Sequence, residues 1–451
     1  MAQRIIASVL IVAMLFVTAC TCFLPAPSVD RPAITSDGSG GAIVIYEVYQ
    51  SQDERGFFVQ RVGPDGDFLW GDKGKLIGSG YKNGSSLFEL FAVSDGSGGA
   101  IVIWNAYPSR PDWKLAPGQR EIPYVTHIAK VDSEGNINWE RELQDCLELE
   151  AIADNFGGII ITTSYAYPAQ RLHVLKIDPE GNFPWGKEGT SLNGYNSSSG
   201  RLDITSDSSG GVIIVQQTDD NSVLAQRINH EGSILWHEDG LLISALHQEE
   251  PRVAGDGSGG AIIVWQHMIP CENQTYASCG EDIYAQKVSA EGNILWQPDG
   301  VPIRTGPSNP TNPEIVTDGA GGAIILFDEG IIYAQRIDAD GYTIWSEAIQ
   351  GGASLYSDGF GGVIIDWRSG GEEKVQRLDA MGRKLWGPDG TLVVTSQGWR
   401  SPSAITGDDC GGVLISWTAG RHIHDATLSY VQKIDAQGNR LWGDEGIRLN
   451  P

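Results

Sequence analysis

Short apolar runs recur along the chain, and each one follows a glycine-rich turn. In the clearest copy, the turn D-G-S-G-G occupies residues 256–260 and the apolar run A-I-I-V-W occupies residues 261–265. A continuous apolar run of this length between turn residues is typical of a strand buried on both faces. Residues 251–255, 283–288 and 293–296 show three further strand patterns. One copy of the repeat therefore predicts four strands, which we name a to d.

The whole unit occurs eight times along the chain. Its turn aspartate recurs at Asp37, Asp95, Asp154, Asp207, Asp256, Asp318, Asp358 and Asp408. A tryptophan closes each copy, at Trp70, Trp139, Trp185, Trp236, Trp296, Trp345, Trp386 and Trp442. Eight units of four short strands predict an all-β, eight-bladed β-propeller with four antiparallel strands per blade. We expect it to form one domain over residues 32–451, since stacked repeats share a continuous core.

The closing tryptophans are matched by large aromatic residues at the ends of most b strands. These are Tyr46, Trp104, Trp265, Phe327, Trp367 and Trp417. A row of indoles could stack against ligands, but a tryptophan in every repeat indicates packing. Burying one indole removes roughly 200 Å² from water, worth about 5 kcal/mol before ordering costs. We therefore expect the eight indoles to hold neighbouring blades together.

A basic residue recurs near the end of every c strand. The eight are Arg61, Lys130, Lys176, Arg227, Lys287, Arg336, Arg377 and Lys433. They could form an anion-binding rim, but the a–b and c–d turns of a blade lie at the same end, so we favour pairing with the turn aspartate. The aspartates could also bind calcium, which prefers six to eight oxygen ligands. One carboxylate per turn is too few, so we expect each aspartate to cap its own turn.

The first residues have the pattern of a processing signal. Arg4 precedes an apolar stretch too short to span a bilayer, and V-T-A-C at residues 17–20 resembles the lipobox of bacterial lipoproteins. The resemblance implies lipid attachment to Cys20 and cleavage before it; an ordinary secretory signal is the alternative. We expect a signal peptide over residues 1–19 and a lipidated linker over residues 20–31. The lipid alone would then hold the protein on the extracytoplasmic side of a bacterial membrane, facing the periplasm or the cell surface.

The remaining cysteines divide into two kinds. Cys271 and Cys279 bracket a polar insertion, and we expect them to form a disulfide in an oxidising compartment. Cys146 and Cys410 lie in different repeats and are interpreted as buried small apolar residues.

Composition and motifs argue against several function classes. The net charge of −26 argues against nucleic acid as a partner, because phosphate binding needs a basic surface. Metalloprotease, Gly-x-Ser-x-Gly and phosphate-loop motifs are missing from the sequence, and we predict a monomer with no cofactor and no metal. His422 and His424 could form half of a metal site, but no further ligand is evident. The glutamate pairs at 249–250 and 372–373 are interpreted as solvated loop charge rather than glycosidase carboxylates.

The propeller topology divides the connections between two ends. The a–b and c–d turns are short, whereas the b–c and d–a connections share the opposite end and include the insertions at residues 105–126 and 266–282. Function usually lies on variable loops held by a rigid frame. The candidate binding residues there are Tyr107, Trp113, Tyr124, Tyr165, Tyr167 and Trp399. Such aromatics could stack on sugars or anchor a protein, or they could pack on their own frame.

The segment Y-A-Q-R-I-D-A-D-G-Y-T-I-W at residues 333–345 resembles the tryptophan-docking motif of quinoprotein-type propellers. The resemblance recurs in all eight repeats, but the chain has one residue fewer between Asp and Gly and lacks the adjacent cysteine pair of many of the dehydrogenases. It therefore implies fold and packing only, without binding of pyrroloquinoline quinone. The chain is also similar in design to the eight-bladed lipoprotein of the outer-membrane assembly machinery, which is lipidated, non-enzymatic and protein-binding.

These observations favour non-catalytic binding or scaffolding. The partner would be a protein or a carbohydrate held on the long-loop face. The alternative is an enzyme acting on polysaccharide, a hydrolase or lyase, with carboxylates or histidines converging at the central channel.

Overall fold

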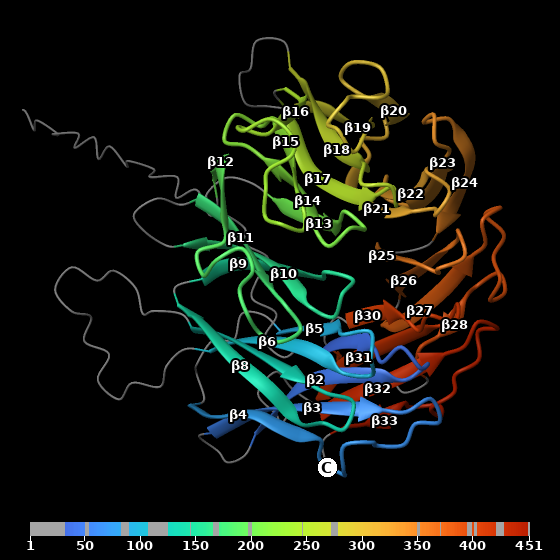
Figure 1. The fold of residues 1–451 in the computed structure, drawn as a ribbon. Coiled ribbons are helices and arrows are strands. Elements are labelled where there is room, and N and C mark those ends of the chain that lie inside the picture. Colours follow the sequence, from blue (N-terminus) through green and yellow to red (C-terminus); the bar gives the residue numbers. More distant parts are fainter. Residues whose placement is uncertain are drawn as a thin grey trace, which may run out of the picture.

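The computed structural model describes residues 32–49, 54–82, 90–106, 125–144, 146–165, 171–196, 201–245, 247–271, 278–349, 352–369, 371–394, 399–400, 404–420 and 428–449. These ranges form 33 strands arranged in eight antiparallel sheets (Figure 1). Within them, no helix has the length and apolar character needed to cross a membrane.

The first four sheets follow one another along the chain, and each pairs its strands in sequence order. Blade 1 contains β1 (Ala33–Ser36), β2 (Ala42–Tyr49), β3 (Glu54–Val62) and β4 (Lys75–Lys82); blade 2 contains β5 (Leu90–Ser94), β6 (Ala100–Ala106), β7 (Val125–Val131) and β8 (Ile137–Gln144); blade 3 contains β9 (Cys146–Ala153), β10 (Ile159–Tyr165), β11 (Arg171–Ile177) and β12 (Thr190–Asn196); blade 4 contains β13 (Leu202–Ser206), β14 (Val212–Gln217), β15 (Val223–Ile228) and β16 (Leu241–Ser244).

The last four sheets repeat the pattern, and only the final one has a divided first strand. Blade 5 contains β17 (Gln248–Gly255), β18 (Ala261–Pro270), β19 (Ser278–Val288) and β20 (Val301–Arg304); blade 6 contains β21 (Thr311–Thr317), β22 (Ala323–Asp328), β23 (Ile332–Ile337) and β24 (Thr343–Ile349); blade 7 contains β25 (Gly352–Ser357), β26 (Val363–Ser369), β27 (Glu372–Leu378) and β28 (Thr391–Leu392); blade 8 contains β29 (Trp399–Arg400), β30 (Ala404–Gly407), β31 (Val413–Gly420), β32 (Leu428–Ile434) and β33 (Ile447–Arg448).

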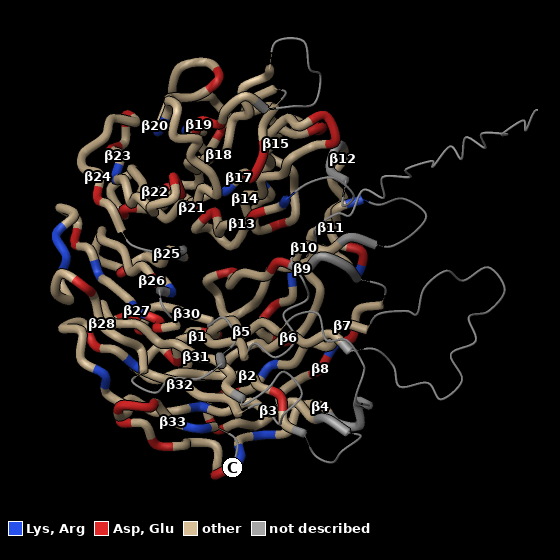
Figure 2. Tube along the Cα trace, turned by 180° about the vertical axis from the view of Figure 1, so that it is seen from behind, with Lys and Arg blue, Asp and Glu red and all other residues tan. Residues whose placement is uncertain are grey.

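The sheets form a closed ring, seen from its two sides in Figures 1 and 2. The first strands of neighbouring blades contact one another around the axis, and β1 contacts β30 of the last blade. Among the residues that the structure places, blade 1 and blade 8 exchange no strand, because each takes its four layers from its own repeat. The predicted eight-bladed propeller with four antiparallel strands per blade is confirmed. The position predicted for the fourth strand of blade 5, residues 293–296, was wrong: that strand is β20 (Val301–Arg304), and residues 293–296 belong to the c–d connection that carries the docking tryptophan.

Each a–b turn is held by its own aspartate. In blade 4, Oδ1 of Asp207 accepts hydrogen bonds from the backbone N–H groups of Ser209 (2.8 Å) and Gly211 (2.7 Å). The same two contacts occur at the other seven turn aspartates. The following residue is left-handed in every blade, with φ of 64° at Asn155 and 61° at Asp409. The predicted capping role of the aspartates is confirmed.

The closing tryptophans dock each blade onto the next one. In blade 4, Nε1 of Trp236 donates to the carbonyl oxygen of Ala290 in the c–d turn of blade 5 (3.1 Å). A Cβ atom on Gly292 of that turn would lie only 2.8 Å from the same indole, so the position requires glycine. The equivalent indole hydrogen bonds join Trp70 to Ser133, Trp139 to Pro179, Trp185 to His230, Trp296 to Ala339, Trp345 to Ala380, Trp386 to Ala436 and Trp442 to Pro64.

The eight basic residues of the c strands, which we call the basic ring, also join strands and blades rather than forming an anion-binding rim. Nη2 of Arg227 lies 2.9 Å from Oδ2 of Asp207 in its own blade, and Nη1 donates to Ala290 O of the next blade (3.0 Å). The other ion pairs of this kind are Arg61–Asp37, Lys130–Asp95, Lys176–Asp154, Arg336–Asp318, Arg377–Asp358 and Lys433–Asp408. Lys287 instead donates to the carbonyl oxygen of Gly321 in the next blade (2.7 Å). Pairing with the turn aspartate is therefore confirmed in every blade except blade 5, to which Lys287 belongs.

The cysteine predictions had different outcomes. Cys271 and Cys279 form the predicted disulfide in blade 5. Cys410 is exposed, so its interpretation as a buried residue was wrong. It is the third residue of the last a–b turn, a position that points outward because the turn's glycines and aspartate form the contacts with the blade. The side chain of Cys146 lies outside the described residues.

Candidate functional site

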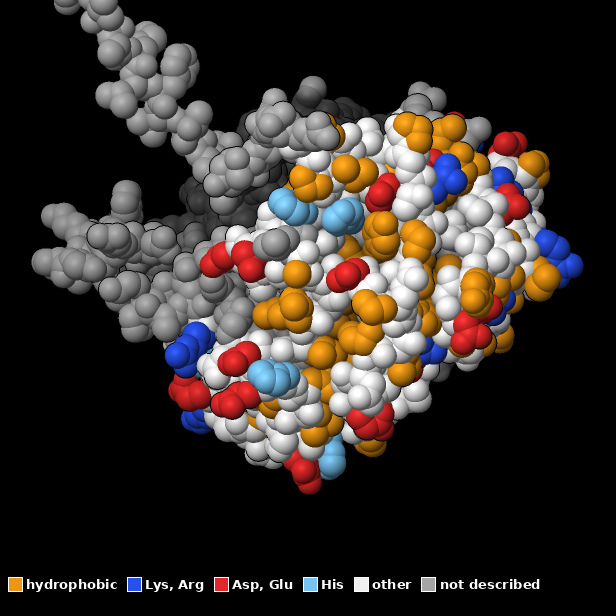
Figure 3. All heavy atoms as spheres, turned by 90° about the horizontal axis from the view of Figure 1, so that it is seen from above, with side chains coloured by type: hydrophobic (Ala, Val, Ile, Leu, Met, Phe, Trp, Pro, Cys, Tyr) orange, Lys and Arg blue, Asp and Glu red, His pale blue; other side chains and the backbone are white. Residues whose placement is uncertain are grey.

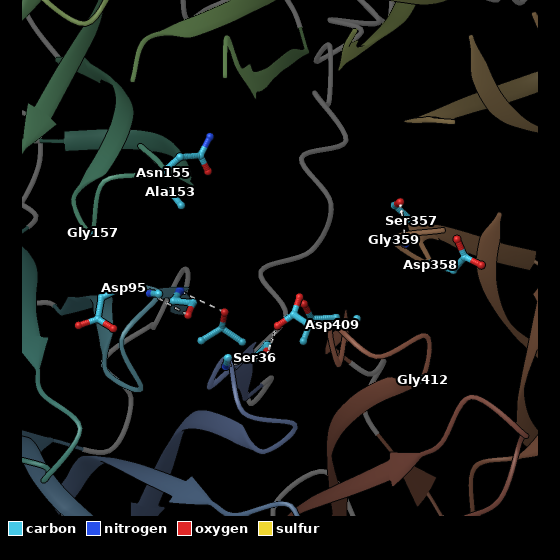
Figure 4. A pocket seen from close by; sticks show the side chains of 16 residues that line it. Ser36, Asp95, Ala153, Asn155, Gly157, Ser357, Asp358, Gly359, Asp409 and Gly412 are labelled. Carbon is cyan, nitrogen blue, oxygen red and sulfur yellow. Dashed lines mark hydrogen bonds between the residues drawn. The ribbon is translucent and has the colours of Figure 1, made fainter. Parts of the chain in front are cut away.

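The central channel opens at the a–b turns into a cavity of about 560 Å³, which we call the mouth cavity. Five blades line it, namely blades 7, 8, 1, 2 and 3, through Thr35, Ser36, Gly38, Ser94, Asp95, Gly96, Ala153, Asn155, Gly157, Ser357, Asp358, Gly359, Thr406, Gly407, Asp409 and Gly412. Figure 4 shows labelled residues from blades 1, 2, 3, 7 and 8 around its open centre. Its volume lies in the range of small-molecule binding sites.

The walls of the mouth cavity are polar and mostly uncharged. Hydroxyls occupy the position before the turn aspartate in blades 1, 2 and 7, and each accepts a hydrogen bond from the backbone N–H two residues later. The Ser36 hydroxyl also donates to the Asp409 carboxylate of blade 8 (2.5 Å), which ties the last blade to the first. The capping carboxylates of Asp95 and Asp358 serve their own turns. The surface therefore offers short polar side chains that can exchange hydrogen bonds with a neutral ligand.

Two exposed phenylalanines flank the mouth cavity. Phe156 and Phe360 are the third residues of the a–b turns in blades 3 and 7, and they are 66% and 63% exposed. Their neighbours Asn155, Gly157 and Gly359 line the cavity. The rings themselves do not belong to the cavity lining: the Phe156 ring lies beside Gly210 of blade 4, and the Phe360 ring centre lies 5.4 Å from the Arg377 guanidinium.

A second group of polar residues lines the channel in blades 4, 5 and 6; we call it the channel cluster. It consists of Arg201, Asp203, Glu250, Arg252 and Glu314. Arg252 lies 3.8 Å from Glu250 of its own blade and 3.7 Å from Glu314 of blade 6, and Arg201 of blade 4 pairs with Glu250. Oδ2 of Asp203 accepts from the backbone N–H of Val253 in blade 5 (2.8 Å). Ionisable side chains from three blades therefore converge on this part of the wall.

The surrounding protein changes the acidity of this cluster. Burial raises the pKa of Asp203 to about 6, against the opposing effects of the Val253 hydrogen bond and the Arg252 charge. Burial also raises the pKa of Glu314, although its side chain remains 43% exposed, as expected for a group on the wall of a channel. The cluster thus combines paired guanidinium groups with two carboxyls whose pKa values are raised, that of Asp203 to about 6.

Two interpretations of glutamate pairs were wrong. Glu250 lies inside β17 in the channel cluster, and Glu373 lies inside β27, where it is buried against Arg368 (3.1 Å). Both were expected in solvated loops. The sequence pattern failed because each pair lies in the polar first part of its strand, ahead of the apolar residues, so that part looked like a loop.

The predicted binding aromatics lie at the edge of the described residues. Tyr165 ends β10 and Trp399 begins β29, but their side chains lie outside the described residues. Tyr107, Trp113, Tyr124 and Tyr167 lie outside them entirely, as do His422, His424 and Cys20. Among the residues that the structure places, no group of three or more His, Cys, Asp and Glu side chains is arranged to hold a metal ion.

Comparison of the repeats could have found both polar sites. Asp203, Arg252 and Glu314 all stand four residues before a turn aspartate, in three consecutive repeats, so propeller symmetry places them at one height in the channel. Phe156 and Phe360 replace the serine of D-G-S-G-G. In each case the signal is a departure from the repeat rather than the repeat itself.

Other exposed apolar residues follow the repeat and form a different pattern. The residue before the docking tryptophan is exposed and aliphatic in six blades, at Leu69, Leu235, Leu295, Ile344, Leu385 and Leu441. In Figure 3, hydrophobic side chains on one flank lie in small groups among acidic and other polar atoms. The six aliphatic residues belong to six different blades, so these described positions do not combine into one apolar patch.

Comparison with known proteins supports the fold and no more. No protein-family profile matches this chain, and no curated protein does. Among solved structures, prolyl oligopeptidase B from Galerina marginata is 8% identical, covers 90% of this chain and 55% of its own, and has a TM-score of 0.49; this chain thus spans about half of that enzyme's length. BamB from Moraxella catarrhalis is 13% identical over 77% of this chain and 81% of its own (TM-score 0.35). An ulvan lyase of polysaccharide lyase family PL25 is 11% identical over 91% of this chain and 96% of its own (TM-score 0.45).

At these identities the likeness concerns architecture alone, and binding and catalytic proteins share it. The chain is an eight-bladed β-propeller with no characterised match.

Proposed function

We propose that the chain is a membrane-anchored extracytoplasmic lipoprotein that acts as a non-catalytic binding or scaffolding module for a protein or a glycan. The observation that carries this proposal is that the repeated side chains contact other parts of the frame. The docking indoles, the turn aspartates and the basic ring are engaged in contacts within and between blades. The repeated chemistry thus builds a rigid frame, while the residues that depart from the repeat are left to contact a ligand.

The path of the chain determines which face an anchor at Cys20 would turn toward the membrane. Strand β1 begins at Ala33 and runs toward the a–b turn, so the chain enters the ring at the face with the long connections. The residues between Cys20 and Pro32 can extend by at most about 40 Å. A lipid on Cys20 would therefore hold the long-loop face toward the membrane and leave the a–b turns facing away from it.

Replacing the lipidated cysteine tests the anchor. We expect Cys20→Ser to move most of the protein from the membrane fraction into the soluble extracytoplasmic fraction, because a single thioether-linked anchor is the only attachment proposed. Cys22→Ser is the matched control and should leave the protein in the membrane fraction. Fractionation followed by immunoblotting provides the measurement, and equal membrane retention of both variants would contradict lipid anchoring at Cys20.

The partner itself is tested by affinity capture from detergent-solubilised native membranes. The full chain is compared with a variant in which the connection between Asn105 and Thr126 is shortened. We propose that the aromatics of this connection, Tyr107, Trp113 and Tyr124, contribute to partner binding on the long-loop face together with Tyr165, Tyr167 and Trp399. Loss of the captured partner from the shortened variant is the expected result, and an unchanged set of partners would remove this connection from the binding surface.

The channel cluster favours a second candidate, an enzyme acting on polysaccharide. Its guanidinium groups suit an acidic sugar, and Asp203 and Glu314 have raised pKa values suited to proton transfer. If this candidate holds, Glu314→Gln and Asp203→Asn should each lower the rate of product formation at least a hundredfold on a cleavable polysaccharide, with circular dichroism unchanged. Cleavage that both variants retain in full would leave the cluster with a structural role.

A further inference from the structure

We propose that a cavity between blades 1 and 2 binds an arginine side chain of a partner protein. Its guanidinium group would lie over the imidazole of His127 and beside Glu140 and Glu142. We call this space the side cavity; its volume is about 540 Å³, and it is lined by Ile77 of blade 1 and by residues of blade 2 that include Trp104, His127, Glu140 and Glu142. The inference rests on the proposed binding function and names a protein as the partner. The observation that carries it is a comparison of two equivalent places in the ring: blade 6 holds an arginine of this chain there, and blade 2 has a cavity.

The side cavity lies at the outer edge of the ring, where β4 of blade 1 and β8 of blade 2 are next to each other (Figures 1 and 2). Trp104 lies near the end of β6 and His127 near the start of β7. These two residues therefore stand at the base of the connection between Asn105 and Thr126, for which we propose partner binding. A ligand in the side cavity would contact the long-loop end of blade 2.

Blade 6 shows which group fits the equivalent place. Arg304 at the end of β20 in blade 5 reaches across to blade 6, where its guanidinium carbon lies 5.3 Å from the ring centre of Tyr333. Its Nε and Nη2 atoms donate to the two carboxylate oxygens of Glu329 (2.5 and 2.7 Å). A guanidinium group from the preceding blade thus lies over an aromatic ring of a c strand and pairs with a carboxylate.

The strand registers establish that the two places are equivalent. His127 and Tyr333 both stand three residues before a member of the basic ring. Each ring stacks on the large aromatic of its own b strand, with ring centroids 5.2 Å apart for His127 and 5.8 Å apart for Tyr333. In the preceding blades, Gly78 and Arg304 each pair with the residue four positions before the basic ring. Gly78 therefore takes the place of Arg304, and this position contributes no side chain to the side cavity.

Blade 2 also has two carboxylates where blade 6 has none. In both blades the fourth strand includes the docking tryptophan, so β8 and β24 align residue by residue. Glu142 pairs with His127 across the strands, and Glu140 stands two residues earlier; blade 6 has Ala348 and Ser346 at these positions. The side cavity thus combines a stacked ring, two carboxylates and a glycine at the position of an arginine. This combination is complementary to an added guanidinium group.

The charges around the side cavity favour a cation. Oε1 of Glu142 lies 3.5 Å from Nδ1 of His127, and the glutamate side chain is 59% exposed, so a ligand can also reach it. Burial lowers the pKa of His127, against the opposing charges of Glu142 and Glu140, so the imidazole is uncharged at neutral pH and does not repel a cation. The Arg141 guanidinium is engaged with blade 3, where its Nε donates to the carbonyl oxygen of Gly181 (2.7 Å).

The test measures peptide binding to the full chain purified in detergent. The probes are three blocked pentapeptides with arginine, citrulline or lysine between pairs of glycines, and saturation-transfer NMR follows the central side chain during a titration. We expect the arginine peptide to bind with a millimolar Kd. The Kd should be at least tenfold higher for citrulline, which has the same shape without the charge, and at least threefold higher for lysine, which has no planar group.

Gly78→Arg is the most direct variant, because it gives blade 2 the guanidinium group that blade 6 already holds. It should raise the Kd of the arginine peptide at least tenfold, whereas Gly78→Ala should leave that Kd within twofold. Glu140→Gln combined with Glu142→Gln should also raise Kd at least tenfold. The matched control, Glu231→Gln combined with Glu238→Gln, removes the same charge from exposed positions of blade 4 and should leave Kd within twofold. All variants should keep the wild-type melting temperature.

Equal binding of the arginine and citrulline peptides would overturn the proposal, as would arginine binding that neither Gly78→Arg nor the Glu140 and Glu142 double variant weakens. Equal affinity for the lysine peptide would show a general acidic surface instead of a guanidinium site. Tighter binding of a glucosamine tetramer would assign the side cavity to a glycan.

Affinity capture from native membranes separates this inference from the proposed function. A partner whose capture requires the connection between Asn105 and Thr126 but is unaffected by Gly78→Arg would leave the binding function standing and remove the arginine site. Loss of the same partner from both variants is the expected result.

Discussion

Replacing Trp442 with alanine is expected to lower the free energy of unfolding by about 3–5 kcal/mol and to loosen one seam of the ring. The indole is 5% exposed, and its Nε1 donates to the carbonyl oxygen of Pro64 in blade 1 (3.1 Å). The alanine variant loses this hydrogen bond and leaves a cavity against Gly66, where a Cβ would be only 3.1 Å from the indole. Trp442 lies at the seam between the last blade and the first.

This seam differs from the others because the chain does not cross it. Blades 1 and 8 complete their sheets from their own strands, so within the described residues the ring is closed by side-chain and turn contacts. Besides the indole, these include Ser36 to Asp409 and the Lys433 ammonium to the Gly40 carbonyl oxygen (2.5 Å each). A defect here allows blades 1 and 8 to separate without unfolding the rest. Native-state hydrogen exchange should therefore accelerate in β2 and β31 well before it does in β14 and β18.

The matched control is Trp236→Ala at the seam between blades 4 and 5. Trp236 is 7% exposed and makes the same indole hydrogen bond, to Ala290. Its loss should lower the free energy of unfolding by a similar amount, but the chain still joins the two blades, so local separation is less favourable. If Trp442→Ala and Trp236→Ala accelerate exchange equally around the whole ring, the seam between blades 8 and 1 is not the weak point.

Features that recur eight times could be predicted from the sequence because symmetry repeats their environment. Trp236, Asp207 and Arg227 each belong to a row of eight, and the fold must satisfy such a row in the same way in every blade. One structural role, derived for one blade, thus applies to the others. Packing of the indoles, capping of the turns and pairing of the basic ring all followed from this reasoning.

Single departures from the repeat were harder to interpret, because their environment depends on which blade faces them. Cys410 was expected to be buried and is exposed, while Glu250 and Glu373 were expected in solvent and lie inside strands. Phe156 and Phe360 went unnoticed among the turn residues. The repeat position of these residues was visible in the sequence, but which face of the blade that position presents became clear only from the assembled ring.

Asp366 is the departure with the largest expected effect on stability. It lies in β26 eight residues after the turn aspartate, where other blades place Ile45, Ile103, Val264 or Leu326. Its strand partner is Val375, a residue of the core between blades 7 and 8, and its Oδ1 atom is buried without a hydrogen-bond partner. Burial, reinforced by the Glu373 charge, raises its pKa to about 7.

The sign of the pH dependence follows from this shift. An unfolded aspartate has a pKa near 3.8, so between that value and about 7 the folded chain holds a proton that the unfolded chain has lost. The contribution of Asp366 to the free energy of unfolding is therefore most favourable at low pH and decreases as the pH rises to about 7. The total decrease is about 4 kcal/mol. Above pH 7 the carboxylate is ionised in both states, and the full cost of burying its charge remains.

We expect Asp366→Val to be more stable than the wild type by about 4 kcal/mol at pH 8 and by much less at pH 4. Urea unfolding of both proteins at pH 4, 6 and 8 gives the difference between their free energies of unfolding. The titration of the other carboxylates affects both proteins equally and cancels in this difference. Asp366→Asn is the control, because it removes the charge but keeps a buried polar group, and its gain at pH 8 should be smaller than that of valine. A stability difference that stays constant from pH 4 to pH 8 would show that Asp366 does not carry a buried charge in the folded ring.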